Sequence, residues 1–239
     1  PARSARGRLP GETVLSGDRT AGRLRRWLSR LAPERGAEAA RLAPAAPPAG
    51  ADWPVLGSKT LARFLAHLGS RPSPVLLDLG PFSGANVTYY GQRLGCKVLI
   101  GDLVTDLDRQ AREGRPVDAA TLLSNRFALD DGSIDGVLLW DVCDYLDGGA
   151  VQALARTLVK ALRAGGVVLG LFGSTPRAGM GGTKFVVEDD SHVRLLPYAT
   201  VLERHGLLPN RAIIRVFDGL RVTESYLLQN GWREMLFRK

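Results

Sequence analysis

Cysteine and long apolar runs are both scarce in this 239-residue chain. Its two cysteines, Cys96 and Cys143, are too few for a disulfide framework and lack the spacing of a zinc site, so a reduced, cytosolic setting is the simplest interpretation. No apolar run approaches the roughly 18 residues that a membrane-spanning helix needs. With 45% hydrophobic residues, however, the chain can build the core of one full-sized globular domain.

Lysine is missing from the first 50 residues, which instead hold ten arginines and four acidic residues. This segment therefore carries most of the chain's net charge of +8. Four of its apolar side chains share one face of a short amphipathic helix: Leu24, Trp27, Leu28 and Leu31. Such a helix could dock on its own domain, lie on an anionic membrane surface or contact RNA phosphates. A proline-rich linker, 43–54, follows it, so we predict an N-terminal extension over 1–54 and one domain over 55–239.

The most informative run is Val75–Gly84, in which a short apolar strand ends at Asp78 and two glycines follow, Gly80 and Gly84. Such a turn brings backbone N–H groups close to a ligand at the carboxyl end of a strand, and glycine removes the side chain that would obstruct the approach. A dinucleotide fingerprint would have a further glycine between these two, where this chain has a Pro-Phe pair. The run thus predicts a nucleotide-type site without matching the dinucleotide pattern.

A second apolar run, 97–101, ends at Asp102, 18 residues beyond Gly84. Apolar residues at positions 87, 90 and 94 predict a helix between the two runs. A carboxylate at the tip of the second strand can accept hydrogen bonds from both hydroxyls of an adenosine ribose. This feature alone fits any cofactor that contains adenosine, including NAD.

A third stretch, Phe127–Trp140, contains an Asp-Gly-Ser turn and then an apolar strand. Together with the turn from Asp78 to Gly84, it resembles the motifs of class I S-adenosylmethionine (SAM) methyltransferases; the chain departs from them at Phe82, where the family has a glycine. The resemblance covers residues 75–172. It implies a three-layer, Rossmann-like α/β fold with a seven-stranded, mostly parallel sheet in the order 3-2-1-4-5-7-6, whose seventh strand is antiparallel.

The resemblance also implies a site for SAM, and we predict no metal ion. Ten residues are predicted to line the cofactor: Asp78, Gly80, Phe82, Gly84, Asp102, Leu103, Asn125, Arg126, Phe127 and Trp140. Asn125 is the candidate polar contact to adenine. Phe127 is the candidate apolar wall, although it could equally be a core residue.

Methyl transfer from a sulfonium group needs a general base only if the acceptor must lose a proton. Asp141, directly after the fourth predicted strand, is the candidate base. Alternatively, it holds the methionine end of the cofactor or caps the next helix. Other candidates by position are Asp144, Tyr145, His192 and Tyr198.

The rest of the chain alternates between helices and strands, which predicts a parallel sheet covered on both faces. We predict helices over 61–68 (capped by Ser58), 151–162 and 198–205, a third strand within 117–123, and strands over 167–172, 211–217 and either 226–228 or 235–237. Residues 173–197 include a predicted hairpin that turns at Asp189 and Asp190. They are predicted to form a substrate lid or, alternatively, a simple extension of the sheet edge.

These observations favour SAM-dependent methyl transfer to a small-molecule acceptor. One alternative is an RNA methyltransferase that holds phosphates with the arginine-rich segment. Another is a non-catalytic module that binds SAM. Nothing in the sequence indicates an oligomeric state.

Overall fold

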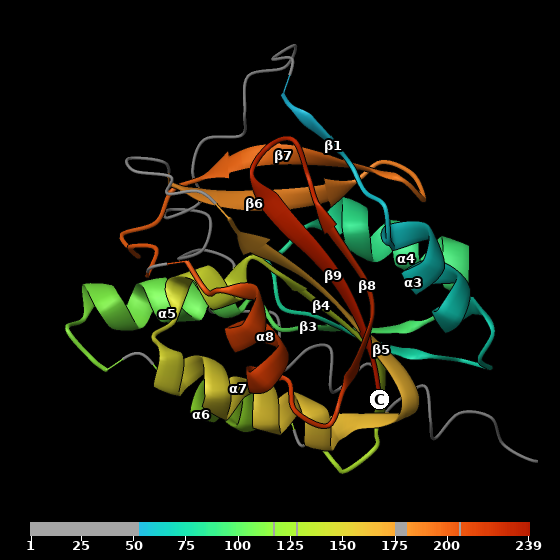
Figure 1. The fold of residues 1–239 in the computed structure, drawn as a ribbon, viewed down its shortest axis with the longest axis horizontal. Helices are drawn as coiled ribbons and strands as arrows, with labels where there is room; N and C mark the ends of the chain where they lie inside the picture. The colour runs from blue at the N-terminus through green and yellow to red at the C-terminus, as the bar shows by residue number, and fades with distance from the viewer. Residues whose placement is uncertain (1–52, 117, 128, 175–180, 206) are drawn as a thin grey trace, which may run out of the picture. The chain divides into compact units, whose positions relative to one another are not determined.

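The computed structural model describes residues 53–116, 118–127, 129–174, 181–205 and 207–239 (Figure 1). The predicted N-terminal extension, with its amphipathic helix, therefore lies outside the described residues except for Trp53 and Pro54. The described part of the chain forms two sheets, one of six strands and one of three.

The six-stranded sheet consists of β2 (Val75–Asp78), β3 (Lys97–Ile100), β4 (Ile134–Trp140), β5 (Leu162–Gly173), β8 (Arg221–Leu227) and β9 (Trp232–Arg238). Its strands lie in the order β3-β2-β4-β5-β9-β8. The first four are parallel, and β9 runs antiparallel to both of its neighbours. In the numbering of the expected fold this order is 2-1-4-5-7-6, with the antiparallel strand where the resemblance implied it.

The expected third strand is not found among the described residues, whose six-stranded sheet ends at β3. The prediction of a strand within 117–123 is wrong, because α6 (Ala119–Arg126) occupies this segment. The Asp118 side chain caps the helix by accepting a hydrogen bond from the Thr121 N–H at 3.0 Å. Ala119 and Leu123 are buried one turn apart, which is the spacing of a helix face rather than of a strand.

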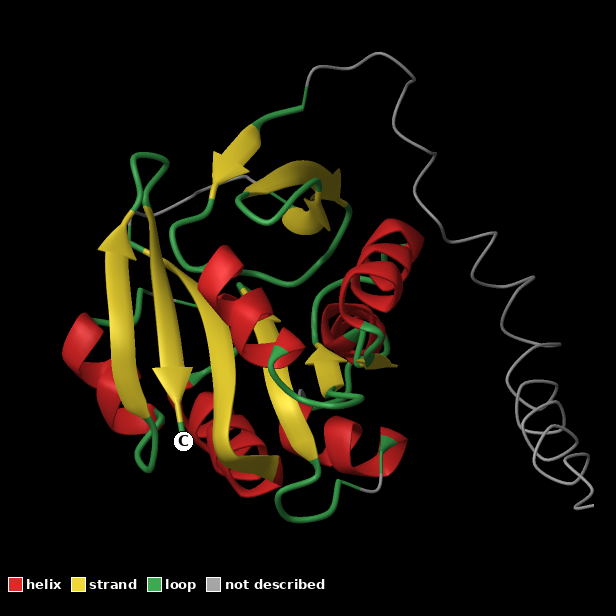
Figure 2. Cartoon of the chain, turned by 90° about the vertical axis from the view of Figure 1, so that its right-hand side faces the viewer, coloured by secondary structure: helices red, strands yellow, loops and turns green. Residues whose placement is uncertain are grey.

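Both faces of the six-stranded sheet are covered by helices (Figure 1 and Figure 2). One face carries α3 (Leu61–Gly69) and α4 (Gly84–Leu94), and the other carries α5 (Leu103–Arg112), α6, α7 (Gly148–Ala161) and α8 (Asn210–Val216). Successive strand residues point to opposite faces, so Leu76 packs on the α3 side and Leu77 on the α5 side. Burial on both faces explains why these strands are continuous apolar runs in the sequence.

The second sheet is built from β1 (Val55–Gly57), β7 (His192–Tyr198) and β6 (Gly182–Val187), in the order β1-β7-β6 with antiparallel pairing. The turn between β6 and β7 contains Asp189 and Asp190, which confirms the predicted hairpin. In Figure 1 this sheet lies across the end of the six-stranded sheet at which β5 finishes. The chain after β5 therefore returns over the carboxyl edge of the parallel strands.

Residues 199–205 form an irregular connection, so the helix predicted over 198–205 is wrong. The Asp108 carboxylate of α5 accepts hydrogen bonds from the Thr200 hydroxyl at 2.7 Å and from the Val201 N–H at 2.6 Å. Hydrogen bonds between side chains and the backbone compete with helix formation. Here the two hydrogen bonds to Asp108 hold residues 200 and 201 against α5 in a non-helical conformation.

The segment 211–217, predicted to be a strand, lies in the helix α8 and its C-terminal end. The helix starts directly after Pro209, and Ile213 and Phe217 are buried one turn apart. In so short a segment the alternating and helical periodicities overlap. Both candidates for the last strand are strands, since 226–228 overlaps β8 and 235–237 lies in β9.

Candidate functional site

Asp78 is the last residue of β2, and its side chain is buried at the glycine turn. Its Oδ1 atom accepts hydrogen bonds from the Gly80 N–H at 3.1 Å and from the Trp140 indole N–H at 2.8 Å. Burial raises the pKa of Asp78 to about 6, although both hydrogen bonds oppose this rise. The structure thus brings three of the predicted cofactor residues into contact.

The Trp140 side chain lies directly against Gly80. A Cβ atom on residue 80 would be 2.5 Å from Trp140 Cδ1, so only glycine fits here without moving the indole ring. Trp140 is 2% exposed, and its ring stacks on Phe185 of β6 with centroids 4.9 Å apart and an interplanar angle of 2°. The space next to the glycine turn is therefore filled by an aromatic side chain of the protein itself.

Asn86, in the first turn of α4, holds the β6–β7 hairpin beside this turn. Its Nδ2 donates a hydrogen bond to the Phe185 carbonyl at 2.8 Å, and its Oδ1 accepts one from the Val187 N–H at 2.9 Å. Both hydrogen bonds are buried, where leaving either backbone group unsatisfied would cost about 1–3 kcal/mol. Asn86 thereby fixes the β6 backbone that carries the ring stacked on Trp140.

Asp102 follows β3 and has a left-handed backbone conformation, with φ of +42°. Its Oδ1 accepts hydrogen bonds from the Phe82 N–H at 3.3 Å and from the Thr105 hydroxyl at 2.6 Å. The Thr105 hydroxyl is also 2.7 Å from the Tyr198 hydroxyl of β7. Burial raises the pKa of Asp102, and the Thr105 hydrogen bond opposes the rise. The turn after β2, the end of β3 and the end of β7 therefore meet around one carboxylate.

Phe82 and Gly84 complete the turn into α4. The Phe82 side chain is 51% exposed, α4 begins at Gly84, and the Ser83 hydroxyl accepts a hydrogen bond from the Asn86 N–H at 3.4 Å. The position at which the family has a glycine thus carries a half-exposed side chain that the core does not require.

The four remaining predicted cofactor residues have different surroundings. Leu103 is buried, Asn125 is exposed, and Phe127 is partly buried against the core on the α5 side of the sheet. Arg126 donates hydrogen bonds to the Gly101 carbonyl and the Asp106 carboxylate. Arg126 therefore reaches the end of β3 from α6.

Asp141, the candidate base, is fully buried with 0% exposure. Arg204 donates hydrogen bonds to Asp141 Oδ2 at 2.6 Å and to Asp144 Oδ2 at 2.7 Å, and the Tyr145 hydroxyl is 3.3 Å from Asp141 Oδ2. Burial raises the pKa of Asp141, and Arg204 opposes the rise. Burial, reinforced by the Asp141 charge, also raises the pKa of Asp144 to about 6. Asp141 thus belongs to a buried ionic network, and its side chain makes no capping hydrogen bond to the 3₁₀ helix η1 (Val142–Tyr145).

The other candidate bases are spread over three places. Asp144 and Tyr145 belong to this network, His192 is exposed at the hairpin turn, and Tyr198 contacts Thr105. No group of three or more His, Cys, Asp or Glu side chains among the described residues could hold a metal ion. The described residues therefore contain no single exposed cluster of acid and base groups at the strand ends.

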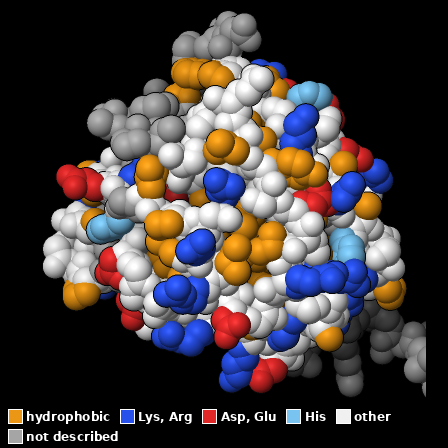
Figure 3. All heavy atoms as spheres, viewed as in Figure 1, with side chains coloured by type: hydrophobic (Ala, Val, Ile, Leu, Met, Phe, Trp, Pro, Cys, Tyr) orange, Lys and Arg blue, Asp and Glu red, His pale blue; other side chains and the backbone are white. Residues whose placement is uncertain are grey.

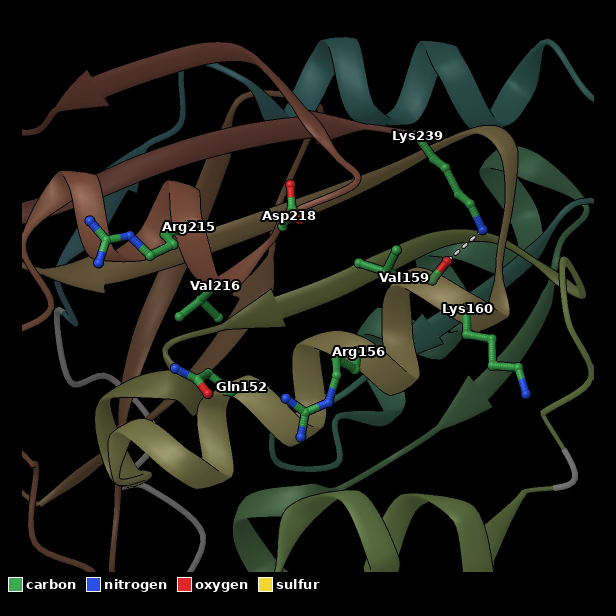
Figure 4. Close-up of a pocket in the computed structure, with 8 residues that line it drawn as sticks. All are labelled: Gln152, Arg156, Val159, Lys160, Arg215, Val216, Asp218 and Lys239. Atoms are coloured by element: carbon green, nitrogen blue, oxygen red, sulfur yellow. Dashed lines mark hydrogen bonds between the residues drawn. The ribbon is translucent and has the colours of Figure 1, made fainter.

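A separate groove lies between α7 and α8, toward the edge at which the parallel strands begin. The face that carries α8 shows basic side chains scattered among apolar and acidic ones rather than in one patch (Figure 3). The groove has a volume of about 420 Å³ and is lined by Gln152, Arg156, Val159, Lys160, Arg215, Val216, Asp218 and Lys239. Its cationic side chains extend in different directions, and Lys239 Nζ donates to the Val159 carbonyl at 2.5 Å (Figure 4). The cationic side chains that line the groove therefore do not point toward one common position where a ligand could bind.

Sequence reasoning missed four residues that shape the strand ends: Asn86, Thr105, Phe185 and Arg204. Each makes its decisive contact with a segment distant in the sequence. Only Phe185 could have been identified from its local sequence, because it is the aromatic residue of an apolar run inside the predicted lid.

No protein-family model and no curated protein sequence matches the chain. A 1,6-didemethyltoxoflavin-N1-methyltransferase from Burkholderia thailandensis is 16% identical, with 96% of this chain and 93% of that chain covered and a TM-score of 0.43. A SAM-dependent methyltransferase from Clostridium acetobutylicum is 11% identical, with 77% and 92% covered and a TM-score of 0.48. One from Mesorhizobium loti is 13% identical, with 74% and 98% covered and a TM-score of 0.45. At these values the similarity identifies neither a substrate nor a reaction.

The topology of the chain itself is the stronger observation. Four parallel strands in the order 2-1-4-5 are followed by an antiparallel strand 7 and then strand 6, with helices on both faces and a glycine turn after strand 1. The chain has the class I methyltransferase fold. In open α/β sheets, ligands bind outside the carboxyl ends of the strands, which is where Asp78, Asp102 and Trp140 lie in this chain. Among the described residues, no helix combines the length and apolar character needed to cross a bilayer.

Proposed function

We propose that the chain binds SAM and transfers its methyl group to a small-molecule acceptor. The main support is the meeting of two strand ends at Asp102, which accepts a hydrogen bond from the Phe82 N–H of the glycine turn. A carboxylate at this position can accept both ribose hydroxyls. Its Oδ2 atom has no hydrogen-bond partner among the described residues. The residues around Asp102 therefore fit the adenosine half of the cofactor.

The methionine half needs a change in side-chain positions. We place this half along the glycine turn, where Trp140 fills the space beside Gly80 and Asp78 already accepts the indole N–H. With the indole ring displaced, the Asp78 carboxylate and the glycine turn could bind the amino-acid end. The residues present thus fit SAM once the Trp140 ring has moved away from Gly80.

When bound, SAM supplies an activated methyl group on a sulfonium centre. The protein then has to orient the reactants and exclude water, which can lower the barrier by about 7–11 kcal/mol where the geometry is ideal. The second sheet supports this role, because its apolar side chains Phe185 and Val193 are buried over the strand ends. The engagement of Asp141 by Arg204 favours an acceptor that reacts without first losing a proton.

The covered strand ends also favour a small acceptor over RNA. An enzyme that acts on a nucleobase must take the target nucleotide into its pocket, and it needs basic surface to hold the phosphates. The arginine-rich segment on which the RNA alternative depends lies outside the described residues. The basic groove between α7 and α8 lies toward the opposite edge of the sheet.

Calorimetry with S-adenosylhomocysteine (SAH), the product form of the cofactor, tests the binding step. Asp102→Ala should weaken SAH binding about tenfold or more, because two ribose hydroxyls lose their charged acceptor. The matched control is Asp131→Asn, in the exposed turn before β4, which should bind normally. Binding of NAD but not SAH would refute the proposal, and unchanged affinity in Asp102→Ala would remove Asp102 from the site. Transfer of label from SAM to a pool of metabolites then separates an enzyme from a SAM-binding module.

A further inference from the structure

We propose that Trp140 closes the amino-acid end of the cofactor site in the cofactor-free protein, and that the indole ring must leave before SAM binds. This inference depends on the proposed function, because it concerns the same site. In this proposal the Trp140 ring occupies the position that the ligand takes and moves away when the ligand binds. A fixed wall of the pocket would instead leave open space between the ring and Gly80. The 2.5 Å separation between a Cβ on residue 80 and Trp140 Cδ1 leaves no such space.

The backbone at the end of β4 directs Trp140 toward the glycine turn. The pairing of β4 with β5 shifts by one residue between Leu138 and Trp140, and Trp140 has a φ of +49°. Bulges redirect side chains. A positive φ is strained for a residue with a bulky side chain and persists only where surrounding contacts hold it. The contacts of the Trp140 ring therefore maintain a backbone conformation that would be unfavourable without them.

Two of those contacts come from different strands, Asp78 from β2 and Phe185 from β6. Asp78 accepts the indole N–H at 2.8 Å, and Phe185 stacks on the ring. Phe185 is fixed in turn by its carbonyl bond to Asn86 and by Trp232, whose ring centroid is 5.3 Å away. The hairpin of the second sheet therefore holds Trp140 in place.

The closed position of the Trp140 ring obstructs only the amino-acid end of the cofactor and leaves the adenosine end accessible. A ligand beside Gly80 must displace the indole ring, and the same movement removes the indole N–H from Asp78 Oδ1. Adenosine ends at the ribose, which would lie at Asp102, and requires neither change. The fraction of open protein thus limits the affinity for SAH but not for adenosine.

The experiment compares SAH and adenosine binding by calorimetry in wild type, Trp140→Phe and Phe185→Leu. Trp140→Phe removes the hydrogen bond to Asp78, and Phe185→Leu removes the stacked ring. Each variant should bind SAH about tenfold more tightly than wild type and adenosine equally well. Phe237→Leu, an equally buried aromatic on the other face of the sheet, is the matched control and should change neither affinity.

Unchanged or weaker SAH binding in both variants, with adenosine binding retained, would overturn the closing role and leave the proposed function intact. Absence of binding of either ligand to all the proteins would overturn both. Adenosine binding also reports that each variant is folded. In wild type, tryptophan emission should change with SAH but not with adenosine, and the SAH-specific change should vanish in Trp140→Phe. The same emission change with both ligands would contradict the movement of Trp140.

Discussion

The ends of β3 and β4 lie at the same edge of one sheet, yet they are built differently. At the end of β3, Asp102 is partly exposed, and its neighbour Thr105 is exposed on α5. At the end of β4, Trp140 and Asp141 are both buried. Each of these two residues is held by side chains that arrive from distant segments, namely Phe185 and Arg204.

We call the β3 end, with Asp102 and Thr105, the prepared end, and the β4 end, with Trp140 and Asp141, the closed end. The β3 end keeps a carboxylate oxygen available for a ligand, and few contacts depend on it. The β4 end buries charged and aromatic groups that must be satisfied internally, since an uncompensated buried charge is costly. We therefore expect substitutions at the β4 end to change stability strongly and those at the β3 end to change mainly ligand recognition.

The largest effect is expected for Arg204→Ala. The substitution leaves the buried carboxylates Asp141 and Asp144 without their cation, which should lower the free energy of unfolding by about 3–5 kcal/mol. Urea unfolding measures this change. Arg109→Ala is the control, because Arg109 is exposed and its pair with Asp106 should contribute less than about 1 kcal/mol. Equal losses in the two variants would show that the β4 network is solvated rather than closed.

A second, smaller effect concerns the pH dependence caused by Asp78. Its pKa in the folded protein is about 6, against 3.8 for an ordinary aspartate. Between these values the folded protein binds a proton that the unfolded chain has released, so stability falls as pH rises from about 4 to about 6 and stays lowered above. At about 1.4 kcal/mol per pKa unit, the full loss is at most about 3 kcal/mol.

Asp78→Asn should remove this part of the pH dependence. The amide oxygen can still accept the indole N–H of Trp140, but it carries no charge, so the variant should be more stable than wild type at pH 7. Urea unfolding between pH 4 and pH 8 measures the difference. Asp144, whose pKa is also about 6, contributes its own slope to both proteins. A wild-type-like slope in Asp78→Asn would mean that the Asp78 carboxylate is hydrated in the folded protein.

The same contrast explains what could be predicted from the sequence. β2, β3 and the hairpin were predictable, because apolar runs and turn residues are local features. Asp78 and Asp102 could be brought together in advance, since parallel strands end at the same edge of a sheet. The secondary-structure predictions were wrong for three segments, 117–123, 198–205 and 211–217. Each segment is short, and its conformation depends on caps and tertiary contacts.

The closed end could not be predicted, because its contacts connect distant parts of the chain. That Trp140 fills the space beside Gly80 depends on a shift in strand pairing and on an aromatic side chain from the second sheet. Arg204 lies in a segment predicted to be helical, and a helix there gave no reason to expect a buried arginine at Asp141. Long-range packing and the burial of charge decide both arrangements.

The smallest effect is expected for Thr105→Val at the prepared end. Thr105 is exposed, so losing its hydrogen bonds to Asp102 and Tyr198 should lower the free energy of unfolding by no more than about 1 kcal/mol. Thr88→Val, which removes an exposed hydroxyl bonded to a helix carbonyl, is the matched control.

The same substitution should nevertheless change recognition. The Thr105 hydroxyl lowers the pKa of Asp102, so its removal should raise that pKa further, and SAH binding should then weaken at a higher pH than in wild type as the carboxylate takes up its proton. Calorimetric titrations across a pH series measure this shift, which Thr88→Val should not show. If Thr105→Val destabilised the protein as much as Arg204→Ala, the two strand ends would not differ in the way proposed, because the β3 end would then also be a structural network.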